Sequence, residues 1–227
     1  MLNWFNKSES KKTVSAQDIK IQSELRIQSL GGQILAGLPI IDENFLSSSM
    51  RTQEQLIHRA LILNVMLRVS FKAPTTFLYS WLDKHNLSAY LSNEERRILS
   101  TPNSDLREQD IVNCRWLMDA LWALLWAGQI TNDLNIDGLI SDNMYQMCPQ
   151  LEHDEGVERF NSMQLRSSPD IYAMLDLYYR AHWYARDAQL NGRDIGIFNA
   201  SVILERRRAL EWLMDDSSDW DFIELST

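Results

Sequence analysis

Residues 114–127 read CRWLMDALWALLWA, and this stretch decides the fold. Its apolar side chains surround the whole helical wheel, and charge interrupts them only at Arg115 and Asp119. A helix that is apolar on every side is one that other elements enclose. The apolar run 116–130 is shorter than the roughly 20 residues that a membrane-spanning helix needs. The stretch therefore predicts a central, buried helix over residues 104–127, which Gly128 ends.

Helical spacing of apolar residues also dominates the rest of the chain, which has only 8 Gly and 5 Pro. The sequence Ser92-Asn-Glu-Glu95 is a capping box that predicts a short helix to residue 99. Ser168 and Pro169 predict the N-cap and first residue of a helix that ends near residue 190. Further helices are expected at residues 15–30, 52–71, 75–85, near 137–148, and 199–214.

The composition fits one soluble domain. We expect an all-α, single-domain bundle of seven or eight helices over residues 15–227, preceded by a mobile leader at 1–14. With 45% hydrophobic and 23% charged residues, the chain is neither disordered, collagen-like, nor a disulfide scaffold. Cys114 and Cys148 form no CxxC pair, and residues 1–12 contain no apolar signal segment. These features favour a cytoplasmic protein with two unpaired thiols.

The charge is acidic and unevenly distributed. The 22 Lys+Arg and 31 Asp+Glu give a net charge of −9, which argues against a nucleic-acid or anionic-membrane partner. Thirteen acids lie in two segments without Lys or Arg, at 133–158 and after Arg208. Either these segments are simply solvated, or they dock a basic protein partner. The residues predicted to bind it are Asp133, Asp137, Asp142, Glu152, Asp154, Glu155, Glu158, Asp215, Asp216, Asp219, Asp221, and Trp220 as an aromatic clamp.

A second group of charges is predicted to be buried. Arg206 falls in the middle of the apolar side of its helix, and Asp119 is the only acid in the apolar half of the central helix. Because an unpaired buried charge is costly, we expect Asp119 to pair with Arg206 or Arg207. Further members of this ion network are expected to be Arg115, Asp176 and Glu205. The network either fixes helix packing or forms a site that binds an anion or transfers protons.

The helix from residue 169 carries a polar stripe of Asp176, Arg180 and Asp187, which predicts a solvated or interface face. His182 lies on the opposite, apolar side, as a core histidine or a general base. If the protein is an enzyme, its catalytic residues are Asp119, Arg206 and His182, but the sequence contains no GxSxG, Cys/His or glycine-rich phosphate motif.

No metal or cofactor site is predicted. The four histidines are dispersed and form no zinc motif. Residues 133–144 begin like a calcium loop, D-x-N-x-D-G, but Met144 stands where a bidentate Glu is required. An Asx-rich connecting loop is the alternative interpretation of this segment.

Several ordered motifs resemble one bacterial family, called domain of unknown function 4272. They are RTQEQLIHRAL at 51–61, LSNEERRIL at 91–99, RWLMDALWALLW at 115–126, LRSSPDIYAMLD at 165–176, YRAHW at 179–183, ERRRALEW at 205–212, and WD at 220–221. The resemblance spans about residues 20–225 and implies an all-α soluble fold, with no established activity. Two departures are Asp119, where the family tends to have Glu, and Ser226-Thr227, where it has an acidic dipeptide.

Three functions remain open. A non-enzymatic binding protein, such as an immunity protein or antitoxin that occludes a basic toxin, should expose its acidic segments together and lack a deep polar pocket. An enzyme, such as a hydrolase or transferase acting on an anionic small molecule, should open Asp119, Arg206 or His182 to a cleft. A subunit of a larger assembly should expose a large apolar patch.

Overall fold

The computed structural model describes residues 14–46 and 50–225. Within these ranges the chain forms nine α-helices and no strand, so the all-α prediction is confirmed; the expected leader at 1–14 falls almost wholly outside them. The helices are α1 (Ala16–Ser29), α2 (Gln53–Ser70), α3 (Thr75–Lys84), α4 (Asn93–Ser100), α5 (Glu108–Ala127), α6 (Met144–Met147), α7 (Val157–Asn161), α8 (Ser168–Leu190) and α9 (Ala200–Met214). Four short 3₁₀ helices accompany them: η1 (Glu43–Leu46), η2 (Ser88–Tyr90), η3 (Asn103–Asp105) and η4 (Trp220–Phe222).

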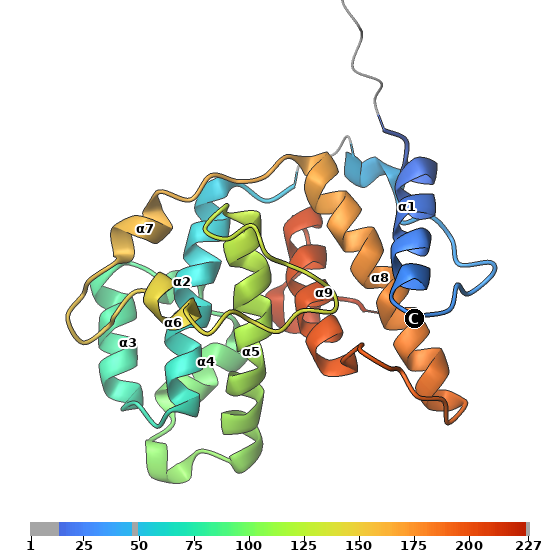
Figure 1. The fold of residues 1–227 in the computed structure, drawn as a ribbon. Coiled ribbons are helices and arrows are strands. Elements are labelled where there is room, and N and C mark those ends of the chain that lie inside the picture. Colours follow the sequence, from blue (N-terminus) through green and yellow to red (C-terminus); the bar gives the residue numbers. More distant parts are fainter. Residues whose placement is uncertain (1–13, 47–49, 226–227) are drawn as a thin grey trace, which may run out of the picture.

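The long helices pack in a row whose order differs from their order in the sequence. From one end of the row to the other, the neighbours are α3, α2, α5, α9, α8 and α1 (Figure 1). Helix α5 lies inside this row, between α2 and α9, and α4 packs against α3. Residues 119–127 of α5 are all buried, as their all-round apolar pattern predicts. None of the described helices is long and apolar enough to cross a membrane.

Local capping signals set most helix starts. Ser15, Thr52 and Ser92 each accept a hydrogen bond from the backbone N–H three residues later, and the side chain at that third position accepts one from the backbone N–H of the cap residue. These capping boxes satisfy backbone donors that a helix start otherwise leaves unpaired. Helix α1 ends before Gly31, whose φ of +85° is a left-handed conformation that glycine adopts without strain.

The structure corrects three predicted boundaries. Helix α5 begins at Glu108 rather than residue 104, because Asp110 accepts the Arg107 backbone N–H and fixes the start there. Helix α8 begins one residue early, with Ser167 as its cap in place of Ser168. The helix expected near 137–148 is reduced to the single turn α6, and α7 was not predicted. Tertiary contacts hold this region: the Pro149 carbonyl accepts hydrogen bonds from Asn64 and Arg68 of α2.

Arg51 fastens the C-terminal segment to the bundle. Its Nε donates to the Trp212 carbonyl at 2.7 Å, its Nη2 donates to the Ser218 carbonyl, and its guanidinium lies 4.2 Å from the centre of the Trp212 ring. Trp220 packs edge-on against Trp212, and Arg208 lies over the Trp220 ring at 4.9 Å. Trp220 is therefore buried in the fold, at 4% exposure, while its predicted role as an aromatic clamp stays a prediction.

We expect Arg51→Lys to lower the free energy of unfolding by about 1–3 kcal/mol, because a lysine cannot replace both carbonyl bonds and the ring contact. Amide hydrogen exchange should quicken first in residues 215–225. The exposed Arg115→Lys is the matched control. Equal exchange in both variants contradicts the role given to Arg51.

Candidate functional site

A buried ion pair joins the two central helices. Arg206 of α9 donates from Nε to Oδ1 of Asp119 on α5 at 3.0 Å, and the two residues are 1% and 5% exposed. Arg206 Nη1 also donates to the Asn135 carbonyl at 3.0 Å and to the Tyr178 hydroxyl at 3.1 Å. Burial raises the pKa of Asp119, and Arg206 offsets part of that rise. The predicted pairing is confirmed, with Arg206 as the partner.

Arg207 organises a second buried group beside this pair. Its Nη1 donates to Nδ1 of His182 at 2.7 Å, and its Nη2 lies 3.1 Å from Oε1 of Glu211. Burial and the adjacent Arg207 lower the pKa of His182 to about 4. His182 is therefore neutral near pH 7, and its Nδ1 lone pair is occupied by Arg207. Of the two roles that the sequence allowed for His182, a core histidine or a general base, this arrangement fits the core histidine.

The remaining network predictions need correction. Asp176 is buried, but it pairs with Arg180 at 2.8 Å and not with the Asp119 group. Helix α1 covers this pair, and Glu24 lies 3.5 Å from Arg180, so the polar stripe is enclosed at these two positions. Arg115 is exposed. Glu205 lies next to Arg208, at 3.8 Å, and makes no ion pair with Arg206.

The Asp119 and Arg207 groups are enclosed by α5, α8, α9 and the 133–137 loop. One buried atom, Nη2 of Arg206, has no hydrogen-bond partner among the described residues, as expected for a place that an ordered water fills. Asp119, Arg206 and His182 are 5%, 1% and 6% exposed, and each is bonded to a partner inside the protein. The arrangement fits helix positioning.

Asp119→Asn should destabilise the fold by about 3–5 kcal/mol, because it leaves the buried Arg206 without its counter-charge. The double variant Asp119→Leu/Arg206→Met removes both charges and should recover most of that loss. Urea unfolding of both variants measures the difference. A double variant as unstable as the single one contradicts a paired-charge origin.

The stability of the fold should also fall with acid. Because the His182 pKa drops from its ordinary 6.5 to about 4 on folding, the unfolded chain binds the proton more readily between these values. The stabilisation is complete above pH 6.5, is lost as pH falls toward 4, and amounts to about 3 kcal/mol at most. Urea unfolding at pH 7.5 and pH 5 should show this loss in the wild type and a smaller one in His182→Gln. If both proteins lose the same stability between pH 7.5 and pH 5, titratable groups other than His182 cause the loss.

The acids of the 133–158 segment divide into two sets. Asp154 holds helix α3: it accepts from Trp81 Nε1 and lies 2.6 Å from Lys84 Nζ and 2.7 Å from His85 Nε2, and the hydrogen bonds with Lys84 and His85 lower its pKa to about 2. Asp137 pairs with Arg26, and Asp133 accepts from Asn135. The other set has no ion-pair partner in the described part of the chain and is exposed: Asp142, Glu152, Glu155 and Glu158.

The C-terminal acids lie along a different part of the bundle. Asp221 accepts the backbone N–H of Glu94 at the start of α4, while Asp215 and Asp219 accept bonds from residues two positions ahead. Asp216 is exposed. Among the described residues, no group of three or more His, Cys, Asp or Glu side chains is arranged to hold a metal ion.

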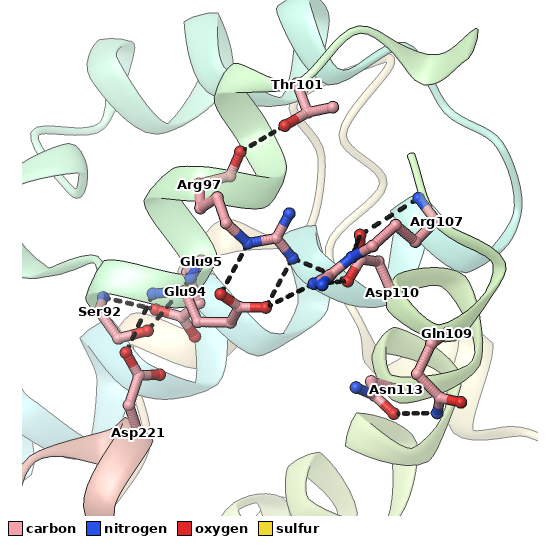
Figure 2. A network of polar contacts seen from close by, with 10 residues as sticks. All are labelled: Ser92, Glu94, Glu95, Arg97, Thr101, Arg107, Gln109, Asp110, Asn113 and Asp221. Atoms are coloured by element: carbon pink, nitrogen blue, oxygen red, sulfur yellow. Dashed lines mark hydrogen bonds and ion pairs between the residues drawn. The ribbon is translucent and has the colours of Figure 1, made fainter. Parts of the chain in front are cut away.

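A surface pocket that the sequence did not predict lies between α4, α5, α9 and η4. Its volume is about 680 Å³. Figure 2 shows the charged network at its wall: Arg97 donates to both Glu94 oxygens at 2.7 and 2.6 Å and to Asp110 at 2.7 Å. Arg107 also donates to Asp110, and the hydrogen bonds from Arg107 and Arg97 lower the pKa of Asp110 to about 2. The sequence predicted a helix start at Glu94–Arg97, but it contained no signal that this helix lies beside α9.

The family comparison agrees with the order of the motifs. The model of a family described as "Domain of unknown function (DUF4272)" matches residues 19–223, nearly the whole chain. The chain therefore belongs to this family, and the predicted resemblance is confirmed. No curated protein and no solved structure matches it.

Proposed function

We propose that this member of the DUF4272 family is a non-enzymatic binding protein that docks a basic protein through its acidic surface. The specific form proposed is a cytoplasmic immunity protein or antitoxin in a bacterium, which covers the active site of a cognate toxin. Such a protein needs a rigid body and an exposed complementary charge, and it needs no reactive group.

One observation carries the proposal. Asp142, Glu152, Glu155 and Glu158 remain exposed and lack ion-pair partners in the described ranges, although the same segment uses Asp154 and Asp137 to fasten itself to α3 and α1. The segment is thus anchored by some of its acids while others face solvent. An acidic surface that is fixed in place and not neutralised by nearby cations speeds the encounter with a basic partner. It also disfavours acidic partners.

The enzyme alternative loses support at the residues named for it. Asp119, Arg206 and His182 are buried, and each is committed to a partner inside the protein. The structure also offers a pocket, between α4, α5, α9 and η4, which a pure docking protein does not require.

The test is affinity capture from the native host, followed by quantitative titration of the captured protein. We expect a basic partner whose affinity falls at least tenfold between 50 and 300 mM salt, because surface charge pairs are screened. Glu152→Gln/Glu155→Gln should weaken binding about tenfold or more.

Asp105→Asn/Glu108→Gln is the matched control, since it changes the net charge equally at two exposed acids near the start of α5. It should leave the affinity within about twofold. Binding that ignores salt, or that both variants weaken equally, contradicts docking at the 142–158 segment.

A further inference from the structure

The pocket between α4, α5, α9 and η4 is of ligand size. Its volume of about 680 Å³ is well beyond that of a few ordered waters and lies within the range of small-molecule sites. Residues of α4, α5, α9 and η4 form most of its lining, Met66 of α2 adds to it, and η4 reaches it because Arg51 and Trp220 fasten the C-terminal segment.

Glu205 is the unusual group of this pocket. Its side chain is only 16% exposed, its Oε2 is buried, and that atom accepts no hydrogen bond from any described residue. The nearest cation, Arg208 Nη1, lies 3.8 Å away, because Arg208 donates its Nη2 to the Trp220 carbonyl and stacks on the Trp220 ring. Burial raises the pKa of Glu205, Arg208 offsets part of that rise, and Asp119 adds to it. The buried Oε2 therefore has no hydrogen-bond donor among the described residues, and its one counter-charge is the long ion pair to Arg208.

The other charged residues around the pocket do not donate to Glu205 or neutralise it. Four lining acids face two lining arginines. Glu95 is neutralised by Arg59 at 2.6 Å, and Arg97 is occupied by Glu94 and Asp110. Asp221 accepts only a backbone N–H. After these pairings the pocket keeps an excess of negative charge.

The apolar part of the lining is open to solvent. Trp116 is 39% exposed and Phe222 is 75% exposed, whereas the other apolar lining residues, among them Leu117 and Ile98, are buried. Aromatic faces attract cations as well as flat apolar groups.

We propose that this pocket binds a small organic cation, with an ammonium, amidinium or guanidinium head on Glu205 and a flat apolar body against Trp116 and Phe222. The head supplies the hydrogen-bond donor that Oε2 of Glu205 lacks and a positive charge closer than Arg208, and the body covers exposed aromatic surface. We assign the ligand to the class of free small molecules, because the volume of about 680 Å³ exceeds what a single lysine or arginine side chain fills. This proposal stands independently of the docking function.

Three probes of one shape test it: the cation benzamidine, the neutral benzamide and the anion benzoate. Titration followed by indole NMR signals should show benzamidine binding at least tenfold more tightly than the other two. The Trp116 and Trp220 indole signals should shift, while those of Trp122 and Trp126, which do not line the pocket, should stay unchanged.

Glu205→Gln should weaken benzamidine at least tenfold and preserve the fold, because Glu205 makes no hydrogen bond that the change removes. Glu211→Gln is the matched control: it is a largely buried acid of the same helix, outside the pocket, and it should leave the affinity unchanged. Phe222→Ala, at an exposed wall position, should weaken benzamidine severalfold without disturbing the core.

Each other result overturns the proposal. Tighter benzoate binding assigns the pocket to anions at Arg97 and Arg208. Unchanged affinity in Glu205→Gln removes Glu205 from the site. No indole shift at 10 mM benzamidine shows that the pocket does not take an organic cation.

Discussion

The ion pair between Asp119 and Arg206 is the constraint on which the rest of the structure depends. It joins α5 to α9 at the centre of the helix row, and Arg206 extends it to the Tyr178 hydroxyl of α8 and the Asn135 carbonyl. An apolar interface alone tolerates sliding and rotation of helices, whereas a buried charge accepts only positions that keep its partner. We regard the pair as a device that fixes the register of three helices more than as a source of net stability.

The same chain uses acidic residues in opposite ways. Inside, Asp119 and Asp176 are each matched to one arginine, so the interior carries little net charge. Outside, Asp154 anchors a loop through α3, while acids such as Glu152 and Glu155 keep their charge in solvent. The net charge of −9 is therefore mainly a surface property. A rigid acidic exterior over a neutralised interior is the arrangement that supports docking to a basic protein.

Glu205 differs from both groups. It is largely buried like Asp119, yet it lies at a pocket and has only a long ion pair of 3.8 Å to Arg208, which also donates to the Trp220 carbonyl. A buried carboxylate oxygen without a hydrogen bond is rare in folded proteins, and it calls for an explanation in packing or in ligand binding. The other wall of the pocket depends on two interactions. Arg51 and Arg208 fasten the C-terminal segment, and Phe222 of this segment lines the pocket.

The sequence by itself determined the helical class, most helix starts and the burial of residues 119–127, because capping and periodicity are local properties of the chain. It also determined that Arg206 needs an acid, since an apolar helix face cannot hold a lone guanidinium. Only the tertiary structure decided that Arg206 and not Arg207 is the partner of Asp119, that α1 encloses Asp176 and Arg180, that Arg115 stays in solvent, and that a pocket opens beside Glu205. These outcomes depend on which helices become neighbours, and the row places α9 beside α5 although some seventy residues separate them in the chain.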